Sequence, residues 1–488
     1  MKKILIIFTL LFLLVPTAYA EHNNEEYICE FPKTLYTPPA VSFFSAPTPE
    51  EILYNRFENA ILSNIKDNAL QRTIPISVLG TNLHFNINDA TYNLDYLLNI
   101  YCNVVYNHPE IGNLITGVNN IKYAADNTTI TTVSPMYRPI YNEQAYQALK
   151  TEEEKEAYLA RTHNVKAFND AVKCAYSKAL SPDMTEDWQK LLSIHDYLAD
   201  TITYSDIVAN GTEEVIKAYQ KDTNYLDWTT YSALVGDRIS VCQGYSLAFK
   251  LLCDMAGIEC GYAISENHIW NIAECNGNFY HIDVTWDDPV SVTVSDGNGN
   301  TYICTSDHVM HRHFLRSDAD STVLHANEGK WTTNMPACDD SNYLSTLLSG
   351  KLADKRFPLY WENGTFWYEE YKYYLYMSTG IVTFEPSGIY YRFINNDFVG
   401  AIYEKLEAKI YNAISDTTET SSIAIDGTPN TTADFYAAIY TDDNNLVDVY
   451  KTDITFNTYG EAVAEFPAGC NRLFLFTDGG MKPLAYSK

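Results

Sequence analysis

Cys242 holds the position in this chain that best suits nucleophilic chemistry. Ser240 and Gln243 match a capping box, which predicts a helix with Ser240 as its N-cap and Cys242 in its first turn. In that turn the unpaired backbone N–H groups and the positive end of the helix dipole favour a thiolate. The same N–H groups suit an oxyanion. Taken alone, the residue has an alternative interpretation as a buried, unreactive cysteine.

His268 and Asp283 are predicted to meet across a β-hairpin. The dipeptide Asn276-Gly277 is the strongest short signal for a hairpin turn. If it forms a two-residue loop, His268 and Asp283 are diagonal neighbours on one face, roughly 7–8 Å apart and within reach of a hydrogen bond. That bond would fix the imidazole tautomer and leave the other ring nitrogen free to take a thiol proton. A register shift of one residue would separate the two side chains, and each alone has a structural alternative, a paired histidine or a turn carboxylate.

The elements that must position these residues predict an α+β core. The helix that begins at Cys242 is apolar on most sides and ends before Gly257, which is typical of a helix in the centre of a domain. An amphipathic helix at about residues 186–200 precedes it. A strand at 258–264 and the hairpin follow it. This order predicts a central Cys-bearing helix packed on an antiparallel sheet.

Three motifs in this order resemble the bacterial transglutaminase-like superfamily. They are V-C-Q-G-Y-S at 241–246, N-H-I-W-N at 267–271 and H-I-D-V-T-W-D at 281–287. The resemblance covers about residues 185–320, although Asp287 follows the tryptophan directly, where the family pattern has one residue between. It implies a papain-like cysteine fold with Cys242 as the nucleophile, His268 as the general base and acid, and Asp283 as the orienting carboxylate.

The resemblance also implies supporting residues. Related enzymes use an upstream aromatic or amide side chain to help hold the oxyanion, and Trp228 and Tyr231 are the candidates in this chain. Other residues match the motifs and are expected to pack around the three catalytic candidates. They are Gly244, Trp270, Asn271 and Trp286.

No metal or cofactor is expected. His308, His311 and His313 form an H-x-x-H-x-H run, but no carboxylate or cysteine stands at motif spacing, so a loop is favoured over a metal site. The ten cysteines contain no CxxC pair, which leaves a structural zinc site without support. Asp287-Asp288 before a proline is favoured as a turn over a calcium site.

Composition and the first residues indicate an exported protein. A basic start, an apolar run too short to span a bilayer and an Ala-Tyr-Ala site predict a signal peptide at 1–20, with no membrane-spanning segment after its cleavage. The chain has 62 Asp and Glu against 33 Lys and Arg, a net charge of -29, which excludes a nucleic-acid partner. The predicted location is secreted, extracellular or attached to the cell surface.

The 488 residues are expected to form several domains. The region before the core reads as mixed and mostly helical, with a β element near residues 130–133 that Pro135 keeps short. Residues 201–240 look irregular. The predicted parts are a signal peptide (1–20), a helical N-terminal region (21–180), the transglutaminase-like core (181–345), a β-hairpin-rich segment (346–415), a linker (416–433) and a small β-sandwich (434–488).

Two kinds of function remain open at this point. The first is a thiol-dependent acyl transferase or hydrolase that acts on peptide or Gln side-chain amides, as a protease, a deamidase or a transglutaminase. Its partner would be a protein or peptide, or a cell-wall or surface polymer. The alternative is a non-catalytic extracellular or cell-surface binding protein with the same fold, and a weaker one is a structural or adhesive module.

Overall fold

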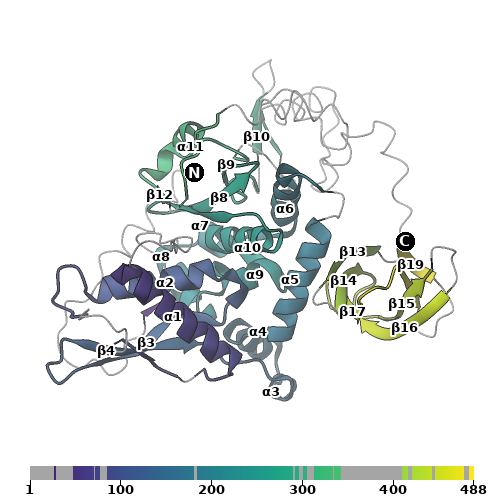
Figure 1. Ribbon diagram of the computed structural model, residues 1–488, viewed down its shortest axis with the longest axis horizontal. Helices are drawn as coiled ribbons and strands as arrows, with labels where there is room; N and C mark the ends of the chain where they lie inside the picture. Colours follow the sequence, from purple (N-terminus) through teal and green to yellow (C-terminus); the bar gives the residue numbers. More distant parts are fainter. Residues whose placement is uncertain are drawn as a thin grey trace.

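The computed structural model describes most of the chain between Tyr27 and Ser487. Its described residues are 27–28, 48–70, 72–76, 85–180, 184–288, 292–295, 301–304, 313–333, 335–341, 409–415, 420–441, 446–477 and 483–487. The predicted signal peptide and nearly all of the predicted hairpin-rich segment lie outside this part. The largest hydrophobic cores form in three parts of the chain, which follow one another from the N-terminus (Figure 1).

The N-terminal part packs two helices on a sheet with the strand order β1-β3-β4-β2. Its strand β4 continues through Pro135, beyond the short element that the sequence predicts. At Pro135 the strand pairs only with β3, because β2 pairs with Thr132 and Val133. Proline is tolerated at such an edge. The elements are β1 (Tyr27–Ile28), α1 (Pro49–Lys66), β2 (Ile74–Pro75), α2 (Leu94–Asn107), η2 (Pro109–Ile111), β3 (Ile115–Tyr123) and β4 (Ile130–Tyr137).

A helical stretch connects the N-terminal part to the core. The amphipathic helix predicted at 186–200 is confirmed as α6, with Trp188, Leu191 and Leu198 buried on one face. The prediction of an irregular stretch at 201–240 is wrong, because the stretch holds short helices that begin at capping residues such as Thr212. The elements are α3 (Glu143–Gln147), α4 (Glu152–Arg161), α5 (Val165–Ala179), α6 (Asp187–Thr201), β5 (Thr203–Tyr204), α7 (Asp206–Asn210), α8 (Glu213–Thr223), η3 (Leu226–Trp228), α9 (Thr230–Leu234) and β6 (Ile239–Ser240).

The central part has α10 (Cys242–Met255) at its core. This helix is almost entirely buried and packs against β8, α6 and α9, as its apolar sequence predicts (Figure 1). The antiparallel sheet beside it has the order β12-β7-β8-β9, and the two-residue Asn276-Gly277 hairpin is confirmed by the pairing of Cys275 with Asn278. The remaining elements are β7 (Cys260–Ile264), β8 (Ile269–Cys275), β9 (Asn278–Ile282), β10 (Val292–Ser295), β11 (Thr301–Cys304), α11 (Asp318–Leu324), η4 (Ala326–Glu328) and β12 (Thr332–Thr333). Helices and mostly antiparallel sheets in separate stretches agree with the α+β prediction.

The C-terminal part consists of two antiparallel sheets that share one apolar core. The predicted linker at 416–433 differs from the structure, since it contains β14, where Ile423, Ala424 and Ile425 are buried. The first sheet holds β13 (Lys409–Ser415), β14 (Thr420–Asp426) and β17 (Glu461–Pro467). The second holds β16 (Leu446–Thr455), β15 (Thr432–Tyr440), β18 (Arg472–Thr477) and β19 (Pro483–Ser487).

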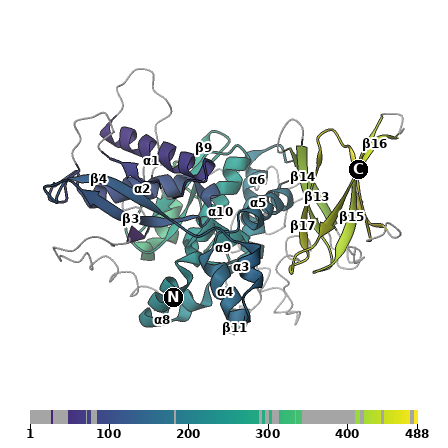
Figure 2. The same cartoon turned by 90° about the horizontal axis from the view of Figure 1, so that it is seen from below.

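The sandwich rests on α5 through its first sheet (Figure 2). Glu461 of β17 forms ion pairs with Lys178 of α5 at 2.7 Å and with Arg238, just before β6, at 2.5 Å. The C-terminal part is therefore tied to the segment that leads into α10. In the described residues, no helix combines the length and the apolar character needed to cross a membrane.

Candidate active site

The fold brings Cys242, His268 and Asp283 together in the interior. The Nε2 atom of His268 lies 2.7 Å from Oδ2 of Asp283, and the thiol of Cys242 hydrogen-bonds to the His268 ring. All three residues are buried. Since Nε2 of His268 is engaged by the carboxylate, Nδ1 is the ring nitrogen available to the thiol.

Cys242 enters the site from the first position of α10. The predicted capping box is wrong, because the N-cap is Val241 and the Ser240 hydroxyl instead donates a hydrogen bond to the Asp227 carbonyl at 2.8 Å. Val241 has no side-chain acceptor, so the N–H groups of the first turn carry no side-chain cap. With Val241 as the N-cap, Cys242 is the first residue of α10, one position closer to the N-terminus of the helix than a Ser240 cap would place it. There it lies beside backbone N–H donors that suit a developing negative charge.

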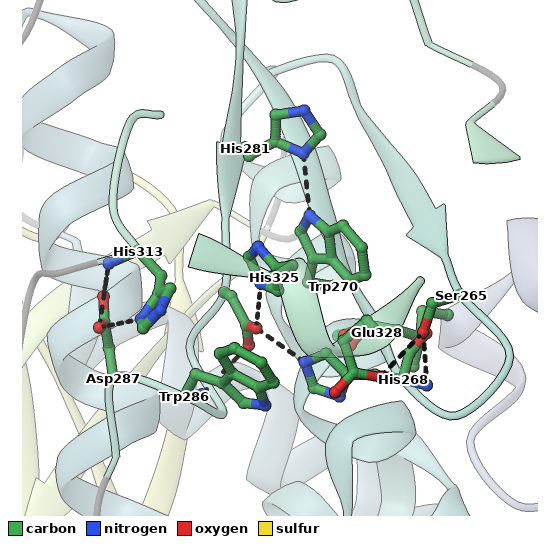
Figure 3. Close-up of polar contacts among 12 residues, drawn as sticks. Ser265, His268, Trp270, His281, Trp286, Asp287, His313, His325 and Glu328 are labelled. Carbon is green, nitrogen blue, oxygen red and sulfur yellow. Dashed lines mark hydrogen bonds and ion pairs between the residues drawn. The ribbon is translucent and has the colours of Figure 1, made fainter. Parts of the chain in front are cut away.

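His268 is held by a tight turn at the start of β8. The backbone N–H of Ser265 donates to the His268 carbonyl at 2.9 Å, and the His268 N–H donates to Oγ of Ser265 at 3.0 Å. The turn connects β7 to β8, so these two strands fix the position of the His268 backbone. Figure 3 shows Glu328 beside His268 and Ser265, and its carboxylate accepts a hydrogen bond from the Ser265 hydroxyl.

Asp283 follows the last paired residue of β9. The ladder ends at Asn271–Ile282, and the N–H of Asp283 donates to the His313 carbonyl at 3.1 Å. Its Oδ1 accepts the backbone N–H of Trp286 at 3.1 Å. Burial opposes the charged carboxylate, but the charge and hydrogen bond of His268 outweigh burial and hold the pKa of Asp283 well below its usual value.

The pKa of His268 is correspondingly high. Burial alone would lower it, but the charge of Asp283, the hydrogen bond to Asp283 and the contact with Cys242 raise it well above the usual value. The surroundings of His268 therefore favour an imidazole that readily takes up a proton.

A second imidazole binds the same carboxylate oxygen. Nε2 of His325, the residue after α11, lies 2.9 Å from Oδ2 of Asp283. The His325 ring stacks on Trp270 at 4.2 Å between centroids and on Trp286 at 4.7 Å, and both indoles also stack with His268 (Figure 3). Sequence reasoning missed His325, since no motif or spacing links it to the hairpin.

A separate cluster of the same kind supports the turn after Asp283. Asp287 is completely buried and contacts His195 of α6 at 3.2 Å and the ring of His313 at 2.8 Å (Figure 3 draws Asp287 with His313). His313 thus has a carboxylate partner, Asp287, which lies outside the histidine run in the sequence. His308 and His311 lie outside the described residues. The neighbouring Asp288 accepts a hydrogen bond from the Tyr245 hydroxyl, so this pair of aspartates ties the turn to α6 and α10.

The two predicted oxyanion residues, Trp228 and Tyr231, have different surroundings. Tyr231 stacks on Phe168, and its hydroxyl hydrogen-bonds to the backbone of Asn164. Trp228 lines a cleft together with Gln243 and Leu247 of α10 and residues of the N-terminal part such as Tyr106. Tyr204 lies in β5, which pairs in parallel with β6 just before Cys242, and its hydroxyl interacts electrostatically with the thiol.

Tyr204 has the electrostatic surroundings of a site residue. Burial, followed by the charges of Cys242, Asp283 and Glu328, raises the pKa of its hydroxyl well above the usual value, so the group stays a hydrogen-bond donor. The one signal for Tyr204 in the sequence is its place within the region of about residues 185–320 that resembles the superfamily.

Two other motif residues, Gly244 and Asn271, make close contacts with neighbouring elements. An added Cβ at Gly244 would lie 1.9 Å from the Ser240 hydroxyl and 2.9 Å from the Thr229 carbonyl, so only glycine fits there. The Asn271 amide donates to the Ser246 carbonyl at 3.0 Å and to the Gly261 carbonyl at 3.2 Å, which joins β8 to α10 and β7.

Two groups of side chains bring possible metal-binding atoms close together in the described part of the chain. They are His268, Asp283 and His325, and His281, Asp318 and Cys338. In the second group Nδ1 of His281 accepts the indole N–H of Trp270 at 2.8 Å, so its Nε2 carries the proton that points to Asp318. Hydrogen bonds from imidazole to carboxylate account for the closeness in both groups.

Comparisons with known proteins give weak similarities. No family model and no curated protein matches the chain. One similar solved structure is a TGase, with 14% identity and a TM-score of 0.20 over 35% of this chain and 44% of that chain. Another is red sea bream transglutaminase, with 8% identity and a TM-score of 0.15 over 64% of this chain and 57% of that chain. The chain thus spans less than two thirds of either protein.

Proposed function

We propose that the protein is a thiol-dependent acyl transferase or hydrolase of the transglutaminase-like, papain-type class that acts on amides of peptides or Gln side chains. One observation carries the proposal: His268 hydrogen-bonds to Asp283 through Nε2 while it contacts Cys242, whose thiol lies at the uncapped start of α10. This arrangement supplies a nucleophile, a proton carrier and an orienting carboxylate.

In the proposed reaction the Cys242 proton moves to Nδ1 of His268, and the thiolate sulfur bonds to the amide carbon. The carbonyl oxygen gains the negative charge, which the first N–H groups of α10 and the Tyr204 hydroxyl are positioned to stabilise. The His268 Nδ1–H then gives its proton to the leaving nitrogen as the C–N bond breaks. A thioester on Cys242 results. Water converts it to an acid, and a primary amine converts it to a new amide.

The proposed enzyme works outside the cell. The basic start, apolar run and small-residue site of residues 1–20 support export, and a strongly acidic chain suits a protein or peptide substrate or a surface polymer better than a nucleic acid. Recovery of the protein in the culture medium with its N-terminus at Glu21 is the expected result, and retention of Met1 in a cytosolic form would contradict it.

The test of the chemistry compares alanine variants of two cysteines in α10. A Gln-bearing peptide panel is offered with and without a primary amine, and ammonia release, cleavage and amine incorporation are followed. Cys242→Ala should abolish product formation, whereas Cys253→Ala, near the other end of α10 and away from the imidazole, should retain it.

Two results would overturn the enzyme proposal. One is equal turnover by the wild-type protein and Cys242→Ala. The other is an absence of product from wild type on the whole panel together with tight, unaltered binding of a panel peptide by Cys242→Ala, which would favour the extracellular binding protein.

A further inference from the structure

His325 shares its acceptor atom with His268. Both rings approach Oδ2 of Asp283 with Nε2, at 2.7 Å for His268 and 2.9 Å for His325. A carboxylate oxygen accepts both bonds only if each ring carries its proton on Nε2. The negative charge on this oxygen is therefore divided between two donors, of which only His268 contacts the thiol.

The carboxylate does not depend on His325 for its orientation. The backbone N–H of Trp286 binds the other oxygen, Oδ1, at 3.1 Å, and the N–H of Asp283 binds the His313 carbonyl at 3.1 Å. Removal of the His325 donor would thus leave Asp283 in place with one hydrogen bond fewer. Its full charge would then act on His268.

We propose that His325 is a positioning residue that draws part of the Asp283 charge away from His268 and so limits how strongly the imidazolium is stabilised. The proposal rests on the proposed function, in which the imidazolium must give up its proton to the leaving group. A histidine that held its proton too tightly would be a poor general acid, since proton transfer is most efficient when the pKa lies near the working pH.

Other titratable groups face this centre, and none duplicates the role. Cys242 contacts His268, and Glu328 lies beside it (Figure 3). The Tyr204 hydroxyl interacts with Cys242, Asp283 and Glu328. His281 and His313 interact with His325. His281 and His313 each bind another carboxylate, Asp318 and Asp287. The only second donor to Oδ2 of Asp283 among the described side chains is His325.

The test compares His325→Phe with His325→Gln. Phenylalanine keeps a flat ring between Trp270 and Trp286 but has no donor, whereas the terminal amide of glutamine places an N–H near the position of Nε2. The pKa of His268 is read from ring nitrogen shifts of protein labelled with 15N-histidine, with the His268→Gln variant to assign the signal. It should rise by about one pH unit in His325→Phe, the size of effect that a nearby charge produces, and stay near the wild-type value in His325→Gln.

An unchanged or lowered His268 pKa in His325→Phe overturns the proposal, because a purely structural role would loosen the Asp283 contact instead. If His325→Phe does not fold, His325→Asn, whose amide is too short to reach Asp283, should show the same rise. The ring shifts need no substrate. A protein that turns over no amide can therefore still show the rise, which separates failure of this inference from failure of the proposed function.

Discussion

At the scale of single residues, the two tyrosines considered for the oxyanion have different surroundings. The Tyr204 hydroxyl interacts with Cys242 and Asp283, whereas the Tyr231 hydroxyl is occupied by the backbone of Asn164. Tyr231 is buried and Tyr204 is partly buried, each beside an aromatic ring, so the loss of a hydroxyl alone changes little packing in either case. The two residues therefore form a matched pair for mutagenesis.

We expect Tyr204→Phe to lower kcat by about 10- to 100-fold with little change in KM, because the lost donor acts on charge that develops in the transition state. Tyr231→Phe should stay within about twofold of wild type. The measurement is steady-state turnover of a peptide from the Gln-bearing panel that wild type converts and Cys242→Ala does not. Equal losses in the two variants would assign both hydroxyls to packing.

At the scale of elements, α6 is joined to the turn after β9 by a buried ion pair. His195 contacts Asp287 at 3.2 Å and Asp196 at 2.9 Å. Burial lowers the pKa of His195, but the bonds and charges of the two aspartates raise it to about 9. A raised folded-state pKa contributes stability that is complete below the unfolded value of about 6.5 and is lost as the pH rises through the folded value.

His195→Gln should therefore reduce the free energy of unfolding by about 3 kcal/mol at pH 6, the usual cost of leaving one partner of a buried pair. The difference from wild type should shrink between about pH 6.5 and about pH 9, as wild-type His195 loses its proton. Urea unfolding of both proteins at several pH values measures it. A difference that grows with pH would show that the pair does not hold charge in the folded state.

Close packing at the start of α10 requires a glycine at position 244. A methyl group at Gly244 would collide with the Ser240 hydroxyl and the Thr229 carbonyl. We expect Gly244→Ala to cost about 2 kcal/mol of stability, in the range found for overpacked sites. Addition of Ser240→Ala should recover part of this loss, because it removes the nearer of the two contacts. Thermal unfolding of the single and double variants is the measurement, and an additive loss would contradict the steric explanation.

At the scale of the whole molecule, ion pairs join the C-terminal sandwich to α5 and to the segment that leads into α10. Glu461 pairs with Lys178 and Arg238, and all three side chains are at most 15% exposed. Glu465 on the same strand pairs with Lys173 at 2.9 Å but is 67% exposed. Buried and exposed ion pairs can therefore be compared on one surface.

Glu461→Gln should destabilise the protein by about 3 kcal/mol, since it removes the carboxylate that the buried Arg238 and Lys178 share and leaves Lys178 with Asp426 alone. Glu465→Gln should change stability by less than about 1 kcal/mol, as exposed pairs do. Arg238 accepts the Thr203 N–H at its carbonyl, next to Tyr204, so Glu461→Gln should also slow turnover. Unfolding curves and kcat for the two variants test both statements, and equal effects would show that the sandwich is a passive attachment.

The sequence determined the parts of this protein that depend on local pattern. The apolar run after Cys242 predicted a buried helix, and the Asn-Gly turn predicted a register that puts His268 within reach of Asp283, because spacing along a short hairpin fixes which side chains meet. Tertiary structure decided what comes from distant segments. The Ser240 hydroxyl binds the Asp227 carbonyl and does not cap α10, the Tyr204 hydroxyl interacts with the thiol, and His325 binds Asp283. Such contacts depend on how elements that are distant in the sequence pack against one another, and neither periodicity nor residue spacing predicts that packing.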